Sequence, residues 1–250
     1  MLKLKNINVS FGHKQVLRNL SCTVEQGDFI VIVGTNGAGK STLFDTIAGR
    51  ILPQSGSIIM NNQDITQVKE QQRAGIVTRI FQNTRLNSVS SMTVAENLAI
   101  AHYSRRSARL VPGTHALPRE QAQQVIEQFG ISPSLLDKKM NQLSGGQRQL
   151  IAFAMCTQKI PQLLLLDEPT AALDPQAATT LLTHAAKFIK KHTVTTLLIT
   201  HDPYIALSLG NKIWMLDQGI ITHEFTAQEK QDLNPDKLIG QIDYQKLAGL

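Results

Sequence analysis

The sequence has few features of membrane-spanning, secreted or metal-binding proteins. Its densest apolar runs, Phe29–Val33 and Leu163–Leu166, fall far short of the ~18 unbroken apolar residues that a membrane helix needs. The opening Met-Leu-Lys-Leu-Lys-Asn lacks the apolar region of a secretory signal. Cysteine is rare, and neither Cys22 nor Cys156 belongs to a Cys-x-x-Cys pair, which favours reduced thiols. We therefore expect a soluble chain that stays in the cytoplasm.

Length and charge bound the function only loosely. A chain of 250 residues, 42% of them hydrophobic, is long enough for one α/β domain with an inserted lobe. A net charge of +6 indicates an anionic partner, such as a nucleotide, a nucleic acid or a membrane surface. Arg105, Arg106, Arg109 and Arg119 cluster without interleaved aromatic residues, which favours a solvated basic face over a nucleic-acid groove. No nucleic-acid partner is expected.

The first part of the chain predicts mostly strands. Leu2–Ser10 alternates apolar and polar residues, and with Leu20–Val24 it predicts half-buried antiparallel strands. Phe29–Val33 is a continuous apolar run rich in β-branched residues, as expected of a strand buried on both faces. A glycine-rich turn and a helix over 40–48 follow. Two further short strands are predicted at 57–60 and 77–81.

The rest of the chain predicts an inserted helical lobe and then alternating strands and helices. From Asn83 to about Lys159 no β-type run occurs, and Thr93 with Glu96 predicts a capping box. The later alternation is typical of βαβ units on a parallel sheet. In order, we expect a helix over 119–129, a strand over 163–167, a helix over 175–192, a strand over 195–200, a short helix after Pro203, and closing strands over 212–217 and 220–223. Trp214 is expected in the core.

A phosphate-binding loop is the strongest chemical signal. Gly34–Ser41 fits G-x-x-x-x-G-K-[ST], and it joins a predicted buried strand to a predicted helix, as such a loop requires. Its backbone N–H groups would surround the phosphates, Lys40 would add a positive charge, and the helix N-terminus would add a partial one. Ser41 would bind Mg²⁺. The residues assigned to nucleotide binding are Gly34, Thr35, Asn36, Gly37, Ala38, Gly39, Lys40, Ser41 and Thr42.

Two acids follow another apolar strand. Asp167 and Glu168 come directly after Leu163–Leu166, so the strand would carry both carboxylates to the edge of the sheet beside the phosphate-binding loop. We expect Asp167 to hold Mg²⁺ and Glu168 to act as general base toward the attacking water. Two acids after a strand are also compatible with a surface turn, but the upstream phosphate-binding loop favours catalysis.

A third motif carries a family resemblance. Leu143-Ser-Gly-Gly-Gln147 stands before a predicted helix and ahead of Asp167, and it resembles the signature of ABC (ATP-binding cassette) ATPases. Ser144, Gly145, Gly146 and Gln147 at a helix N-terminus would form a second anion site. The resemblance implies a P-loop NTPase of the ABC ATPase type. Such a protein has a RecA-like parallel-sheet core, an antiparallel β subdomain and an inserted helical subdomain.

The resemblance covers nearly the whole chain and implies a subdivision and further site residues. It makes the chain a single ABC ATPase domain, with core and β subdomain at 1–82 and 160–225, the helical subdomain at 83–159 and a tail at 226–250. Gln82 resembles the family's glutamine, which contacts Mg²⁺ and the attacking water. Asp174 ends a segment similar to the D-loop, and His201 resembles the switch histidine. Phe11 corresponds to the aromatic that stacks on adenine, where tyrosine is commoner.

The other histidines receive no role, because they fall in loops or on predicted helix surfaces. They are His13, His102, His115, His184, His192 and His223.

The family's mechanism implies the partners. Two ATP molecules are held between two copies of the chain, with Lys40, Gln82 and His201 acting on the γ-phosphate in cis and Ser144 in trans. The segment 81–98 resembles a groove for a membrane permease, and the similarity is greatest to bacterial importers that use an extracytoplasmic binding protein, including amino-acid systems. We expect an ATPase on the inner face of the plasma membrane. An exporter ATPase and a soluble ATPase of iron–sulfur cluster assembly stay open as alternatives.

Overall fold

The chain folds into two compact units. In the computed structural model it is described over residues 1–83, 87–102 and 117–248, so Arg105, Arg106, Arg109 and His115 lie outside the described residues. The first, here called the sheet unit, contains 1–79, 162–168 and 193–250, and the helix unit contains 80–161 and 169–192. The predicted subdivision differs from these units, because it put 80–82, 160–161 and 169–192 with the core.

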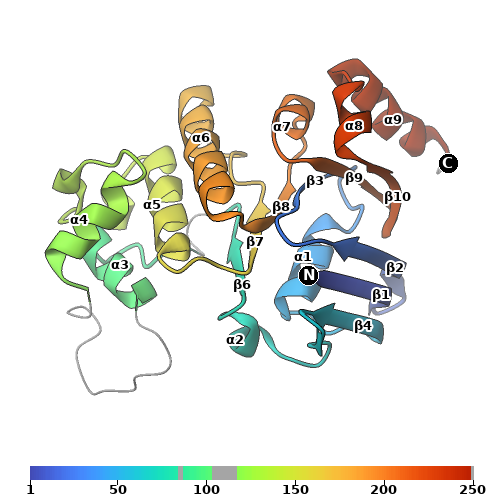
Figure 1. Cartoon of the computed structure of the whole chain (residues 1–250), viewed down its shortest axis with the longest axis horizontal. Coiled ribbons are helices and arrows are strands. Elements are labelled where there is room, and N and C mark those ends of the chain that lie inside the picture. Colours follow the sequence, from blue (N-terminus) through green and yellow to red (C-terminus); the bar gives the residue numbers. More distant parts are fainter. Residues whose placement is uncertain (84–86, 103–116, 249–250) are drawn as a thin grey trace. The chain divides into compact units, whose positions relative to one another are not determined.

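An antiparallel sheet opens the sheet unit. Among the described residues it has four strands in the order β2-β1-β4-β5; Figure 1 labels β2, β1 and β4. The burial of β1 changes phase in the middle: Leu2 and Leu4 are buried, and then Ile7 and Val9. A bulge causes this change, because the register shifts at Asn6, whose φ is +51°. The strands are β1 Leu2–Phe11, β2 Lys14–Val24, β4 Ser55–Met60 and β5 Gln63–Asp64.

A mostly parallel sheet forms the rest of the sheet unit. In the described part of the chain its order is β10-β9-β3-β8-β7-β6, with β10 antiparallel to β9. The pairs β3–β8, β3–β9 and β7–β8 are parallel, which confirms the predicted alternation. The strands are β3 Phe29–Val33, β6 Val77–Ile80, β7 Leu163–Asp167, β8 Thr195–Ile199, β9 Lys212–Asp217 and β10 Ile220–Phe225. The helices of this unit are α1 Lys40–Ala48, α2 Glu70–Arg73, α7 Pro203–Ser208, α8 Ala227–Gln231 and α9 Pro235–Ala248.

Helix α1 joins the two sheets through one hydrophobic core. Leu43, Phe44 and Ile47 of α1 are at most 1% exposed, and the core cluster that contains them draws side chains from β1, β2 and β4 as well as from β3, β7, β8 and β9. Trp214 is 1% exposed within this cluster, so its predicted core position is confirmed. The packing fixes where α1 begins, and therefore where the preceding loop ends.

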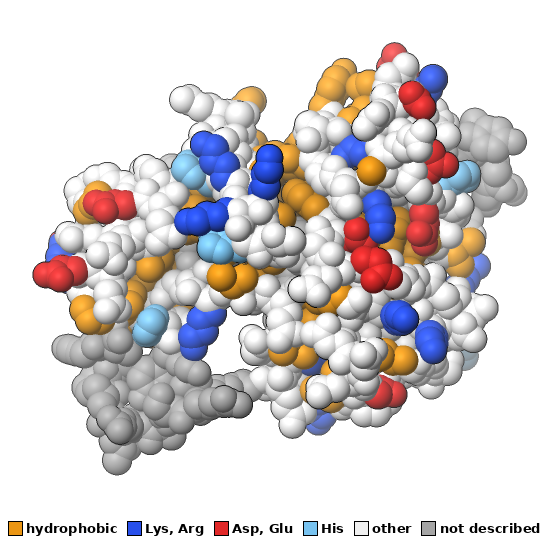
Figure 2. Space-filling model, viewed as in Figure 1, with side chains coloured by type: hydrophobic (Ala, Val, Ile, Leu, Met, Phe, Trp, Pro, Cys, Tyr) orange, Lys and Arg blue, Asp and Glu red, His pale blue; other side chains and the backbone are white. Residues whose placement is uncertain are grey.

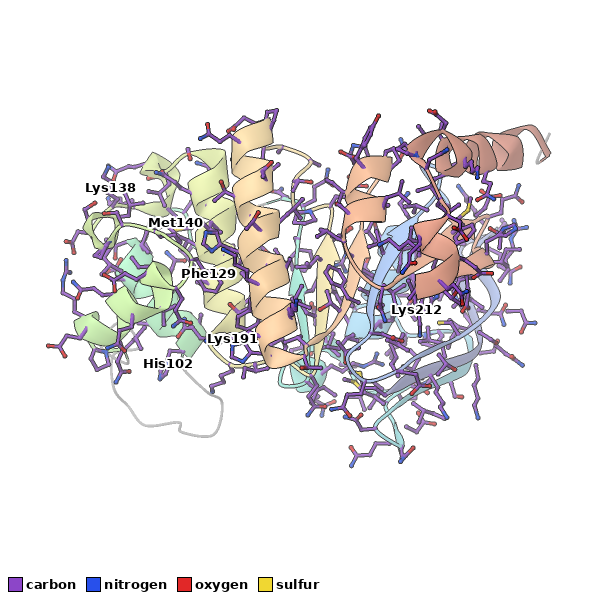
Figure 3. All side chains as sticks on the ribbon, turned by 45° about the horizontal axis from the view of Figure 1, so that its top comes forward. His102, Phe129, Lys138, Met140, Lys191 and Lys212 are labelled. Atoms are coloured by element: carbon purple, nitrogen blue, oxygen red, sulfur yellow. The ribbon has the colours of Figure 1, made fainter. Side chains whose placement is uncertain are left out.

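The helix unit contains the predicted helices and their capping box. Thr93 N donates to Glu96 Oε2 at 2.7 Å, and Glu96 N donates to Thr93 Oγ1 at 3.2 Å. Phe129, labelled in Figure 3, packs with Phe153 and Phe188 at ring-centroid distances of 5.4 and 6.2 Å, which ties α6 to α5. This packing explains why α6 groups with the helix unit. The elements are α3 Val94–His102, α4 Arg119–Glu127, η3 Pro133–Leu135, η4 Met140–Gln142, α5 Gly145–Thr157 and α6 Pro175–His192.

The structure describes both cysteines and the lengths of the helices. Both cysteines are free, and burial raises the pKa of each thiol to about 12, so both stay protonated at neutral pH. None of the helices in the described ranges is long and apolar enough to cross a membrane. Basic side chains gather over α6 (Figure 2), whose last turn contains Lys190, Lys191 and His192. Cations at this end of a helix complement its dipole.

A buried arginine holds the end of α1. Arg73 is 0% exposed, and burial lowers the pKa of its guanidinium to about 10, so it is still protonated at neutral pH. It satisfies carbonyl groups that end α1 and that line the loop before α2. Its Nε, Nη1 and Nη2 atoms donate at 2.5 to 3.1 Å to the carbonyl oxygens of Thr46, Ile47, Ile65, Thr66 and Val68.

Arg73→Met should lower the free energy of unfolding by about 3 kcal/mol or more, because each buried carbonyl left without a donor costs ~1–3 kcal/mol. Urea unfolding followed by the fluorescence of Trp214, the single tryptophan of the chain, measures this loss. Arg50→Met is the control: its side chain is 42% exposed and lies 3.6 Å from Asp45 and 3.7 Å from Glu70, so its effect should stay within about 1 kcal/mol. Equal losses in the two variants would contradict the role given to Arg73.

Candidate active site

The loop between β3 and α1 needs glycine at defined positions. Gly34, Gly37 and Gly39 have φ values of +156°, +83° and +103°, which residues with a side chain rarely adopt. A Cβ on Gly34 would also lie 2.0 Å from the carbonyl oxygen of Leu216. The loop therefore packs with its backbone directly against β9, and α1 begins at Lys40 immediately after it.

The turn between β9 and β10 supports this loop from behind. Gly219 N donates to Ala38 O at 2.9 Å, and Thr35 Oγ1 donates to Asp217 Oδ1 at 3.3 Å. A Cβ on Gly219 would lie 2.0 Å from Val16 O, so only glycine fits there. Sequence reasoning missed Asp217 and Gly219. The available signal was the Asp-Gln-Gly turn between two predicted strands.

The side chain of Lys40 bonds back to the start of its own loop. Its Nζ donates to Gly34 O at 2.8 Å and to Thr35 O at 2.9 Å. Burial lowers the pKa of this ammonium group, while Glu168 and Asp167 oppose that shift. In front of the loop lies a cavity of about 280 Å³. It is lined by Lys14, Val16, Asn36, Gly37, Gly39, Lys40, Ser41, Thr42 and Glu168.

Two acids and a histidine meet at the ends of neighbouring strands. Asp167 is the last residue of β7, and Glu168 follows it with a φ of +45°. Glu168 N donates to Ile199 O at 3.1 Å, which fixes this strained residue at the end of β8. The Nδ1 atom of His201 lies 3.4 Å from Glu168 Oε2. The predicted trio of Lys40, Glu168 and His201 is thus brought together in the sheet unit.

An arginine that sequence reasoning missed contacts the first of these acids. Arg79 Nη2 donates to Asp167 Oδ2 at 2.6 Å, and Arg79 Nη1 donates to Asp45 Oδ1 at 2.6 Å. The signal in the sequence was an arginine within the apolar strand Val77–Phe81. The side chain of Arg79 is only 7% exposed, so both contacts lie in partly dry surroundings.

The predicted signature residues lie in the helix unit. Ser144 is the N-cap of α5: its Oγ accepts from Gln147 N at 3.2 Å, and its N donates to Gln147 Oε1 at 3.1 Å. Asp174 Oδ1 accepts from Ala177 N at 2.9 Å at the start of α6. A Cβ on Gly146 would lie 2.6 Å from Ala177 Cβ, so glycine lets α5 and α6 approach. These residues thus have local roles within one chain.

A cavity of about 570 Å³ opens beside the signature, within the helix unit. It is lined by Gly130, Ile131, Ser132, Leu135, Ser144, Gly146, Gln147, Leu150, Asp174, Gln176, Ala177 and Thr180.

Gln82 and Phe11 are exposed side chains in different units. Gln82 belongs to the helix unit. The preceding residue, Phe81, exchanges two hydrogen bonds with the side-chain amide of Asn87, at 3.0 and 2.9 Å, and these hold the segment after β6. Phe11 ends β1 and is 53% exposed. It does not line the cavity in front of the phosphate-binding loop. The roles predicted for both residues stay predictions.

Comparison with known proteins identifies the family. The family model described as ABC transporter matches residues 17–171. The chain is 36% identical to a tyrosine transport ATP-binding protein of Clostridioides difficile, over 98% of this chain and 99% of that protein. It is 31% identical to a spermidine/putrescine import ATP-binding protein of Vibrio vulnificus, over 97% of this chain. It spans only 63% of the length of that second relative.

Solved structures agree with the family match. A nucleotide-free ATP-binding cassette from an ABC transporter superposes with a TM-score of 0.80 at 28% identity, covering 93% of this chain and 94% of that one. An ATP-binding cassette solved as a dimer in a post-hydrolysis state with ADP and Pi gives a TM-score of 0.76 at 25% identity, covering 91% and 99%. These matches confirm the predicted fold class. The chain therefore belongs to the ABC transporter family and is an ATP-binding cassette ATPase.

Proposed function

We propose that this chain binds ATP with Mg²⁺ in the sheet unit, hydrolyses it within a dimer of identical chains, and powers the import of a small solute such as an amino acid through a membrane permease. One observation carries the proposal. The phosphate-binding loop, Lys40 and Glu168 line the same cavity of about 280 Å³, next to the N-terminus of α1.

The cavity suits a polyphosphate. The N-terminus of α1 supplies backbone N–H groups and a partial positive charge. Lys40 Nζ, now on the carbonyl oxygens of Gly34 and Thr35, would turn to the phosphates when a nucleotide binds. The exposed ring of Phe11 is the candidate for stacking on adenine.

The residues around the loop also fit a magnesium ion. Ser41 follows Lys40 on α1 and lines the cavity, and Asp167 ends β7. A hydroxyl and a carboxylate are hard oxygen donors, which Mg²⁺ prefers. Ser41, Asp167 and Gln82 are the residues that we assign to it. When bound, the ion would neutralise charge on the phosphates.

We assign the role of general base to Glu168. Glu168 lines the cavity, and its φ of +45° is the kind of strain that persists at functional sites. His201, 3.4 Å away, would orient it and contact the γ-phosphate. Glu168 would accept a proton from the attacking water, and Gln82 would help to position that water.

Glu168→Gln should keep ATP affinity but lower turnover by about 10²–10⁴-fold, because the amide has the shape of the carboxylate and cannot accept the proton. A phosphate-release assay measures turnover, and calorimetry measures ATP affinity. The variant should also accumulate as an ATP-bound dimer on gel filtration. Near-normal hydrolysis would show that another group is the base.

A dimer would complete each active site. Ser144, Gly145 and Gly146 begin α5, so the backbone N–H groups of a helix N-terminus accompany an exposed hydroxyl. We propose that this surface contacts the γ-phosphate bound by the second copy and that Asp174 lies at the interface. Solved cassettes similar to this chain that form dimers support the proposal.

Mixing two inactive variants tests the dimer. Ser144→Arg should bind ATP as a monomer and fail to form the ATP-dependent dimer, because a bulky cation blocks the signature surface. Lys40→Ala should lose nucleotide binding. Together they should regain part of the ATPase activity, since the loop of the first and the signature of the second form one working site. Ser144→Thr, which preserves the helix cap, is the control.

The dimer proposal fails if the mixture stays inactive while both variants are folded. It also fails if Ser144→Arg hydrolyses ATP normally at dilutions where only monomers exist.

Import is supported by the agreement in length with a transport relative. The alignment with the tyrosine transport ATP-binding protein covers 98% of this chain and 99% of that protein, and the spermidine/putrescine relative is named for import. We propose permease subunits as direct partners and an extracytoplasmic binding protein as an indirect one. The chain would then lie at the inner face of the plasma membrane.

Deleting the gene should abolish saturable uptake of labelled tyrosine at low concentration, because a permease without its ATPase cannot transport the solute against a gradient. The wild-type gene should restore uptake, and the Glu168→Gln gene should not. Excess unlabelled amino acids should compete, whereas sulfate and spermidine should not. Unchanged uptake of tyrosine and other amino acids would reject amino-acid import, and slower efflux in the deletion strain would indicate an exporter.

A further inference from the structure

Arg79 joins the acid at the end of β7 to helix α1. Its Nη2 donates to Asp167 Oδ2 and its Nη1 donates to Asp45 Oδ1, each at 2.6 Å. The side chains of Arg79 and Asp167 are only 7% and 11% exposed. The Cζ atom lies 5.8 Å from the ring centroid of Phe44. The guanidinium is therefore held by two carboxylates and an aromatic ring, and it holds Asp167 in turn.

Charges of opposite sign alternate outward from the phosphate-binding loop. Lys40 interacts electrostatically with Asp167, and Asp167 pairs with Arg79, which pairs with Asp45. The Nη1 atom of Arg50 then lies 3.6 Å from Asp45 Oδ1. The most buried ion pair of this row is the one between Arg79 and Asp167.

The contact selects one oxygen of the carboxylate. Arg79 takes Oδ2 of Asp167, so Oδ1 is the oxygen that we assign to the metal or to its bound water. A carboxylate with one oxygen fixed in a hydrogen bond cannot rotate freely about its side-chain bond. Such outer contacts on a metal ligand typically change metal affinity by ~10–100-fold when they are removed.

We propose that Arg79 is a positioning residue that orients the Asp167 carboxylate for Mg²⁺, an inference that rests on the magnesium site proposed above. An arginine suits this role because its planar fork reaches two carboxylates with separate N–H groups, whereas a lysine ammonium is a single point charge. Asp45 and Phe44 contact the fork from the side of α1.

The test measures how much Mg²⁺ tightens ADP binding, so that hydrolysis plays no part. Calorimetry gives the Kd of ADP in excess EDTA and in excess Mg²⁺, and their ratio is the magnesium effect. In Arg79→Met the ratio should fall by about tenfold or more, while the Kd in EDTA stays at the wild-type value. Arg79→Lys should also lose most of the magnesium effect. This variant keeps the positive charge, so it serves as the test if Arg79→Met fails to fold.

Asp45→Asn is the matched control. It removes the charge of the second carboxylate bound by Arg79 and leaves the contact with Asp167 in place. If Arg79 only ties β6 to α1, Asp45→Asn and Arg79→Met should alter ADP binding alike, with and without Mg²⁺. If Arg79 acts through Asp167, the ratio of Asp45→Asn should stay near that of the wild type.

A double-mutant cycle tests whether Arg79 acts through Asp167. In the Asp167→Asn background, adding Arg79→Met should leave the remaining magnesium effect unchanged, because the carboxylate to be oriented is gone. An additive loss would overturn the inference, as would a wild-type ratio in either Arg79 variant. If the wild-type chain itself shows no magnesium effect, the proposed magnesium site fails and this inference falls with it. If the wild-type chain shows a normal magnesium effect and the Arg79 variants keep it, only the inference about Arg79 is rejected.

Discussion

The site depends on backbone packed directly against backbone around the phosphate-binding loop. There is no room for a side-chain atom where Gly34 passes Leu216 or where Gly219 passes Val16, since a Cβ at either glycine would lie 2.0 Å from a carbonyl oxygen. The loop, the β9–β10 turn and β2 therefore come together only in this arrangement. The core around α1 fixes the other end of the loop, and the first residues of the helix line the cavity.

The regular elements were largely predictable because their signals are local. Apolar runs predicted β3 and β7 with the bounds that the structure has, and the glycine-lysine motif predicted the loop and the start of α1. Helices α8 and α9 were missed and only a tail was expected, although Thr226 and Glu229 form a capping box at the start of α8.

The parts of the site that sequence reasoning missed depend on contacts between distant residues. Arg79 and Asp167 are separated by 88 positions, and Thr35 and Asp217 by 182. No periodicity or spacing pairs such residues, because only the order of strands in the sheet brings them together. Arg73 illustrates the same limit, since a single arginine in a short polar segment gives no sign that it will be fully buried.

The signature segment has a structural role within one chain and a proposed role at the dimer interface. Within one chain, Ser144 caps α5, Asp174 caps the start of α6, and Gly146 lets the two helices approach. These local roles leave the N-terminus of α5 ordered and its serine exposed before any partner arrives. A surface prepared in this way loses little conformational entropy on contact with a phosphate. The same capping geometry therefore stabilises the helix and prepares the proposed interface.

Charges of opposite sign meet beside the phosphate-binding loop. The side chain of Asp167 is only 11% exposed, and a buried charge is costly unless a charge of opposite sign pairs with it. Lys40 and Arg79 supply two cations to the side on which Asp167 and Glu168 lie, and each interacts with Asp167. If a bound nucleotide draws the Lys40 ammonium away from the loop carbonyls, as we propose, Arg79 still pairs with Asp167. In the proposed site, Arg79 therefore holds the carboxylate for the metal while Lys40 serves the nucleotide.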